Sequence, residues 1–169
     1  FTLLSNLQEV LAGIQNGTIT YPFVQKSCTA GYDGKGVAVI RNANDLPKLL
    51  EGACVIEQLI DFEKELAVIV ARDVDGKTTC FPAVEMEFHP VANLVEFLLA
   101  PAIISEQAAA NTQKNVEDCI TAFGLTGILA VEMFLTKSGE ILINEVAPRP
   151  HNSGHHTIEA NYVSQYEQL

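Results

Sequence analysis

The sequence predicts an α+β fold with mainly antiparallel sheets, and three observations support this. The predicted order is a helix, a hairpin, a helix and then mostly hairpins, so helices do not alternate regularly with strands. The strand-like segments follow one another through short turns, and strands joined so tightly are antiparallel. Apolar residues make up 48% of the 169 residues, which is enough to bury a core.

The first part of the chain predicts a helix, a hairpin and a short helix. Ser5 begins a capped amphipathic helix that ends near Gly17. Strands at residues 21–26 and 37–40 flank a long loop that carries glycines. Asn44 can then cap a short helix.

The remaining chain predicts further strands and two helices. Asp75-Gly76 is a hairpin turn signal, and Gly124 is a candidate helix C-cap. The predicted elements here are strands at 54–60, 65–71, 78–88, 128–135 and 141–146, and helices at 105–123 and 157–169.

Composition argues against several classes of protein. A net charge of −11 disfavours a nucleic-acid partner, because phosphate binding requires a basic surface. The four cysteines include no CxxC pair, which argues against a zinc knuckle and favours the reduced thiols of a cytoplasmic protein. The longest apolar stretches are strand-sized, so no membrane span or signal peptide is expected. The first residue, Phe1, and a chain that stops within a predicted helix indicate a fragment.

Two glutamates in the last predicted hairpin are candidate metal ligands. If the turn is centred between Ser138 and Gly139, Glu132 faces Glu145 directly. Their neighbours are strongly apolar, which predicts burial on both sheet faces. Facing carboxylates repel each other, and a divalent cation such as magnesium removes that cost. The alternative is a solvated sheet face, and a one-residue slip would separate the two side chains.

The segment after Glu145 is rich in polar groups. Residues 147–156 contain two prolines, one arginine, three histidines and an asparagine. Such a segment is a poor core builder and a good anion or substrate site. The alternative is a metal site or a tag-like histidine cluster, and the interleaved Arg149 and Asn152 disfavour it.

The loop Gly31–Gly36 can approach an anion closely, because its three glycines leave the main chain accessible. Lys26 and Lys35 add positive charge, so a flap over nucleotide phosphates is one interpretation and an ordinary hairpin loop the other. The loop is neither a Walker A motif nor a dinucleotide fingerprint, because it does not lead into a helix.

Together these segments resemble the ATP-grasp family, and within it the 5-(carboxyamino)imidazole ribonucleotide synthases, the ATPase subunits of phosphoribosylaminoimidazole carboxylase. The resemblance extends over nearly the whole chain. The motifs that carry it are Gly31–Gly36, Glu57–Ile60, Phe62–Leu66, Glu132 and Asn144–His155.

The resemblance implies a fold, an activity and partners. Two lobes of mainly antiparallel sheet would clasp the nucleotide: residues 1–58 with the flap, and residues 59–169, truncated at the C-terminus, with the family's N-terminal α/β domain absent. The family uses ATP, Mg²⁺ and bicarbonate to form carboxyphosphate and to carboxylate 5-aminoimidazole ribonucleotide in purine biosynthesis. It also implies a cytoplasmic homodimer for the full-length protein.

The resemblance also implies roles for individual residues. Nucleotide contacts would come from Lys26, from the flap residues Gly31, Tyr32, Asp33, Gly34, Lys35 and Gly36, from the adenine-reading strand Glu57, Gln58, Leu59 and Ile60, from Glu65 on the ribose, and from His89 and Asn144. Glu132 and Glu145 would hold the metal. The catalytic residues would be Asp33, Arg149, His151 and Asn152, the last three around bicarbonate and carboxyphosphate.

The sequence departs from the family next to the flap. Ser27 and Cys28 stand where an arginine often follows the lysine, and Ala30 replaces a glycine. These changes either weaken the hold on phosphate or simply mark a lineage. Two other functions stay open: another ATP-grasp carboxylate–amine ligase, such as a formate-dependent glycinamide ribonucleotide transformylase, and a non-catalytic nucleotide-binding fragment. An α+β domain with an incidental histidine-rich tail is a third alternative.

Overall fold

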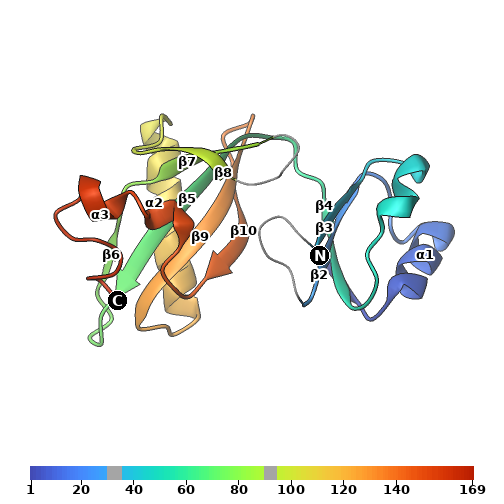
Figure 1. Cartoon of the computed structure of the whole chain (residues 1–169), viewed down its shortest axis with the longest axis horizontal. Coiled ribbons are helices and arrows are strands. Elements are labelled where there is room, and N and C mark those ends of the chain that lie inside the picture. The colour runs from blue at the N-terminus through green and yellow to red at the C-terminus, as the bar shows by residue number, and fades with distance from the viewer. Residues whose placement is uncertain (30–35, 90–94) are drawn as a thin grey trace. The chain divides into compact units, whose positions relative to one another are not determined.

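A computed structural model describes residues 1–29, 36–89 and 95–169 (Figure 1). These residues form two compact units, one of residues 1–29 and 36–60 and the other of residues 61–89 and 95–169. Every strand pair among them is antiparallel, which confirms the predicted α+β class.

The first unit is a four-stranded sheet of order β1-β4-β2-β3 with two helices. Helix α1 begins after Asn6, whose side chain accepts a hydrogen bond from the N–H of Glu9, and it ends at Gly17, where φ is 79°. Val10 on its buried face packs with the sheet residues Phe23 and Ile40. The elements are β1 (Thr2–Leu4), α1 (Leu7–Asn16), β2 (Phe23–Ser27), β3 (Val37–Ile40), η1 (Ala43–Lys48) and β4 (Cys54–Gln58).

Two details of this unit differ from the prediction. Strand β1 is additional, and it pairs with β4 at the edge of the sheet. The prediction that Asn44 caps the short helix is wrong. The cap is Asn42, whose side-chain oxygen accepts a hydrogen bond from the N–H of Asn44 at 3.0 Å.

The second unit is a sheet of order β10-β9-β5-β7-β8, with β6 paired to β5. Its long central strands, β5 and β9, pair along their whole length (Figure 1). The elements are β5 (Phe62–Arg72), β6 (Thr78–Cys80), β7 (Val84–Phe88), β8 (Val95–Leu99), α2 (Glu106–Ala122), β9 (Gly127–Thr136), β10 (Ile141–Ala147), η2 (Asn152–Gly154) and α3 (Thr157–Ala160).

Helix α2 packs against one face of this sheet. Ser105 caps it by accepting a hydrogen bond from the N–H of Ala108. Its buried residues recur every four positions, the spacing that places them in one stripe. Val116 and Ile120 from this stripe pack with Val131 and Met133 of β9. Within the described ranges, no helix is both long and apolar enough to cross a membrane.

Three predicted elements of this unit are corrected. The return strand at 78–88 is divided into β6 and β7 around Pro82, which has no N–H to donate to a sheet. Strand β8 pairs with β7 and was not predicted. The predicted helix at 157–169 ends at Ala160, because the backbone of Asn161 is extended.

Candidate functional site

The turn between β9 and β10 is a three-residue loop centred on Ser138. The N–H of Thr136 donates to the carbonyl of Glu140, and Gly139 has a φ of 84°. This is the usual form of a three-residue hairpin loop, with glycine in the left-handed region. The predicted turn centre, between Ser138 and Gly139, is therefore wrong by half a residue. From this turn alone, Asn144 and not Glu145 would face Glu132.

A β-bulge in β10 restores the predicted pair. Ile143 pairs with Met133, and the next pair is Glu145 with Glu132, so Asn144 is an extra residue in β10. A bulge of this kind changes the face to which the following side chains point. The prediction that Glu132 faces Glu145 is confirmed, although the turn on which it depended is placed differently.

The two facing carboxylates differ in exposure. The Glu132 side chain is only 14% exposed, because β9 lies inside the sheet, whereas Glu145 is exposed on the edge strand β10. The prediction that both strands are buried on both faces holds for β9 and is wrong for β10, where Ile143 is 48% exposed. One carboxylate of the pair is therefore shielded from solvent, and the other is accessible to solvent or to a ligand.

Glu65 lies on the same face of the sheet. Glu65 pairs with Phe134, and Ala67 pairs with Glu132, across β5 and β9. Residues two apart on a strand share a face, so Glu65, Glu132 and Glu145 lie on one side. Val131 and Met133 alternate with Glu132 and contact α2, so the carboxylates lie on the opposite face from that helix.

The polar segment after β10 lies over this carboxylate face. Helix η2 contacts β5, and Gly154 lies directly over Ile69. A Cβ atom on Gly154 would stand 2.3 Å from Ile69 Cδ1 and 2.6 Å from Gln165 Oε1. Only glycine allows so close an approach, which explains its position in this segment.

His151 brings its ring to Glu132. Its Nε2 atom lies 3.5 Å from Glu132 Oε1, and the residue is buried. Burial, with the nearby charges of Arg149 and His155, lowers the pKa of His151 to about 4. The ring is therefore neutral at pH 7, and its approach to Glu132 is a polar contact between a neutral ring and a carboxylate.

The other two predicted anion-binding residues face solvent. Arg149 is exposed, and its Nη1 atom donates to the carbonyl of Pro150 at 3.0 Å. Asn152 is exposed, and its Oδ1 atom accepts from the N–H of Ser153 at 2.9 Å. Both side chains are available to a ligand next to the buried His151.

The predicted nucleotide residues Lys26 and Glu57 of the first unit lie on adjacent strands β2 and β4. Lys26 Nζ is 2.8 Å from Glu57 Oε2, so these two side chains form an ion pair. Gln58 ends β4, Leu59 and Ile60 follow it, and Gly36 precedes β3 with a φ of 80°. The predicted flap residues Gly31, Tyr32, Asp33, Gly34 and Lys35 lie outside the described residues.

The predicted residues are thus divided between the units. Within the second unit, Glu65, Glu132 and Glu145 share one sheet face, and Asn144 is the bulge residue of β10. His89, also in this unit, follows β7 and is exposed.

Sequence analysis missed Gln165. It is completely buried, and its side chain makes two hydrogen bonds to the main chain of His151, 14 residues earlier. The local sequence predicts a helix at this point, so only the tertiary structure identifies the contact.

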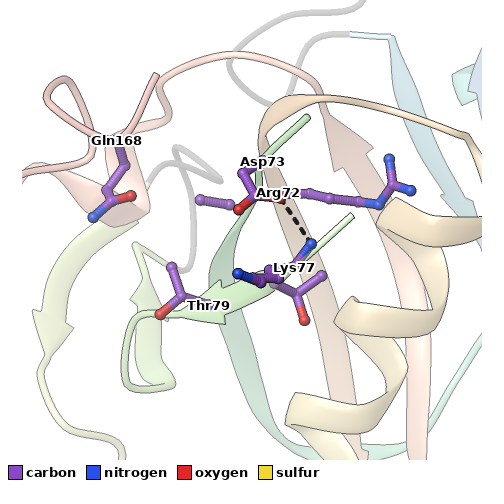
Figure 2. A pocket seen from close by; sticks show the side chains of 7 residues that line it. Arg72, Asp73, Lys77, Thr79 and Gln168 are labelled. Atoms are coloured by element: carbon purple, nitrogen blue, oxygen red, sulfur yellow. Dashed lines mark hydrogen bonds between the residues drawn. The ribbon is translucent and has the colours of Figure 1, made fainter. Parts of the chain in front are cut away.

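A separate pocket of about 220 Å³ lies at the β5–β6 turn (Figure 2). Lys77, Thr79 and Gln168 line it, and hydrogen bonds between Asp73 and Lys77 close the turn. Arg72 directs its guanidinium away from the pocket, and its Nη1 atom donates to the carbonyl of Leu125. None of the predicted site residues lines this pocket.

The family model of the ATP-grasp domain matches residues 1–166. The chain belongs to the ATP-grasp family. It is 39% identical to the N5-carboxyaminoimidazole ribonucleotide synthase of Bacillus subtilis, over 99% of this chain and 44% of that protein. It is 41% identical to the phosphoribosylaminoimidazole carboxylase of Saccharomyces cerevisiae, over 87% of this chain and 26% of that protein. The chain therefore spans less than half the length of these relatives.

Solved structures of similar proteins also support membership of this family. An ADP complex of an N5-carboxyaminoimidazole ribonucleotide synthetase superposes with a TM-score of 0.88 at 38% identity, over 98% of this chain and 44% of that one. The Aspergillus clavatus enzyme, in complex with ADP and 5-aminoimidazole ribonucleotide, has a TM-score of 0.80 at 28% identity, over 99% of this chain and 44% of that one. The predicted ATP-grasp fold and the resemblance to carboxyaminoimidazole ribonucleotide synthases are confirmed.

Proposed function

We propose that this chain is the ATP- and magnesium-binding part of a ligase that carboxylates 5-aminoimidazole ribonucleotide, with ATP and bicarbonate, in purine biosynthesis. The observation that carries the proposal is the Glu132–Glu145 pair, facing across β9 and β10 beside His151. The relatives bear the names of enzymes of this reaction, and one solved relative holds ADP with 5-aminoimidazole ribonucleotide.

The donor atoms of the pair fit magnesium. Two carboxylates and the amide of Asn144 supply oxygen atoms, the ligands that Mg²⁺ prefers. The described residues contain no group of three or more histidine, cysteine or acidic side chains that could enclose a metal. A site with so few protein ligands suits Mg²⁺, which usually keeps water and substrate phosphate oxygens in its shell. When bound, magnesium would neutralise charge on the phosphates during phosphoryl transfer.

The other residues position the substrates in this proposal. Lys26 and the flap residues would bind nucleotide phosphates, Glu57–Ile60 would read adenine, and Glu65 would hold the ribose. Exposed Arg149 and Asn152 would bind bicarbonate and the carboxyphosphate formed from it, with His151 beside them. A cytoplasmic location and a homodimer of the full-length protein complete the proposal.

Binding of the nucleotide is tested by thermal unfolding of the chain. At a Mg-ATP concentration ten times the dissociation constant, we expect stabilisation of about 1.4 kcal/mol, a rise in Tm of about 3–6 °C. ATP with EDTA and Mg²⁺ alone are the controls, and each should give a smaller rise. An unchanged Tm at millimolar Mg-ATP would refute nucleotide binding by this chain.

Arg149→Ala tests the carboxylation site. In the intact enzyme that contains this chain, we expect carboxylation to fall about 10²–10³-fold, the usual cost of losing one group that stabilises developing negative charge. Stabilisation by Mg-ATP should stay near wild type, because Arg149 lies outside the carboxylate pair. Turnover is measured as ADP release with bicarbonate and 5-aminoimidazole ribonucleotide, with the exposed Arg41→Ala as the matched variant.

The same assay separates the alternatives. ADP release with formate and glycinamide ribonucleotide, but not with bicarbonate and 5-aminoimidazole ribonucleotide, would favour the transformylase reaction. Stabilisation by Mg-ATP without turnover on either pair would favour a nucleotide-binding fragment.

A further inference from the structure

The side-chain amide of Gln165 makes two hydrogen bonds to the main chain of one residue that is distant in sequence, His151. Its Oε1 atom accepts from the N–H of His151 at 2.9 Å, and its Nε2 atom donates to the carbonyl of His151 at 2.8 Å. Gln165 is 0% exposed, so solvent cannot replace either bond. Two buried bonds to the N–H and the carbonyl of one residue restrain both the position and the orientation of His151.

Further contacts hold Gln165 in place. Its N–H donates to Thr157 Oγ1 at 2.9 Å, and that hydroxyl donates to the carbonyl of Gly154 at 2.6 Å. Gly154 in turn donates its N–H to the carbonyl of His151 at 3.0 Å. The network therefore closes on itself and includes the glycine that lies over Ile69 of the sheet.

The ring of His151 is held in one orientation. The N–H of Ser153 is shared between Asn152 Oδ1, at 2.9 Å, and His151 Nδ1, at 3.4 Å, and the Ser153 hydroxyl lies 2.9 Å from the same Nδ1 atom. With Nδ1 as an acceptor, Nε2 carries the ring N–H. Nε2 is the atom that faces Glu132 Oε1.

We propose that Gln165 is a positioning residue that holds the main chain of His151 so that the ring N–H is directed at Glu132 and orients this carboxylate for the cation. The metal part of this inference rests on the proposed function, whereas the orientation of the ring does not. Loss of a hydrogen-bonding partner that orients a metal ligand commonly lowers the affinity of the site for the metal by about 10–100-fold, although the partner does not contact the metal.

The ring itself gives a test that needs no metal. In the ¹⁵N-labelled chain at pH 7.5, the ring nitrogens of His151, assigned with His151→Gln, should show the Nε2-protonated tautomer. Gln165→Met keeps the volume of the side chain and removes both bonds, and we expect both tautomers to appear. Gln168→Met is the matched control, because Gln168 lines the separate pocket at the β5–β6 turn, and it should leave the His151 signals unchanged.

Manganese binding is the second readout. With ADP present, Mn²⁺ affinity measured by electron paramagnetic resonance should fall about tenfold in Gln165→Met. The affinity for ADP measured in EDTA should not change, whereas a general loss of structure would lower it. Should Gln165→Met not fold, Gln165→Glu retains the acceptor for the N–H of His151 and should show a smaller change in both readouts.

The outcomes separate this inference from the proposed function. Unchanged His151 signals in a folded Gln165→Met or Gln165→Glu chain would overturn the positioning role. Altered signals with unchanged Mn²⁺ affinity would overturn its link to the metal. A wild-type chain that binds neither Mn²⁺ nor ADP would refute the proposed function, while the ring signals would still decide whether Gln165 positions His151.

Discussion

Replacing Gly154 by alanine is expected to lower the free energy of unfolding by about 1–3 kcal/mol, the usual cost of adding a methyl group to a tightly packed site. The new Cβ would stand 2.3 Å from Ile69 Cδ1 and 2.6 Å from Gln165 Oε1, both in the buried interior. Neither neighbour can move away freely, because the Ile69 side chain is buried among Ile128 and Ala130 and Gln165 is bonded to His151. Urea unfolding measures the change.

A second substitution identifies the cause of this loss. Ile69→Val removes Cδ1, the atom nearest to the new methyl group, and alone should cost about 0.5–1.5 kcal/mol. The double variant should then be more stable than the sum of the two single changes predicts, since its members are in contact. Strict additivity would show that the close approach of Gly154 to Ile69 is not the source of the effect.

The facing glutamates show how far sequence reasoning extends. It placed the turn between Ser138 and Gly139, and the structure centres it on Ser138, the place that a three-residue loop ending in a left-handed glycine requires. The bulge at Asn144 then adds one residue to β10 and returns Glu145 to a position opposite Glu132. The three-residue turn and the bulge thus compensate for each other in the pairing of the two glutamates. The only local sign of the bulge is Asn144 itself, because asparagine has a poor strand propensity.

The burial of β9 was accessible for a simpler reason. Its continuous apolar run predicts a strand that is buried on both faces, and residues 128–131 are all buried. The same argument fails for β10, because whether a strand lies at the edge of a sheet depends on the whole topology. For that reason Glu145 is exposed and Glu132 is not, a difference between the two proposed metal ligands that the sequence does not contain.

The C-terminal segment shows where local pattern is overridden. Residues 157–169 have helical character in sequence, but the helix stops at Ala160. Gln165 instead hydrogen-bonds both main-chain polar groups of His151, its N–H and its carbonyl, and these bonds join residues 14 positions apart. Long-range pairing of this kind outweighs helix propensity, which differs between ordinary residues by less than about 1 kcal/mol.

Replacing Glu145 by glutamine is expected to weaken binding of Mn²⁺ with ADP at least about 10–100-fold. A loss of about 10–100-fold in metal affinity is usual when a group that only supports a metal ligand is removed. Removing a ligand itself should lower the affinity by at least as much. Glutamine keeps the size of the side chain and one oxygen donor, and it removes the charge. The affinity is measured by titration with Mn²⁺, and Glu140→Gln, an exposed position in the turn of the same hairpin, is the matched control.

The stability of the metal-free chain should change in the opposite direction. Facing like charges in a strand pair are unfavourable, so Glu145→Gln should leave the metal-free Tm unchanged or raise it. A structural role for Glu145 would instead lower the Tm and leave Mn²⁺ affinity near that of Glu140→Gln. If Glu145 is a metal ligand, Glu145→Gln must lower Mn²⁺ affinity without lowering the stability of the metal-free chain. The reason is that two facing carboxylates are favourable only when a cation is bound between them.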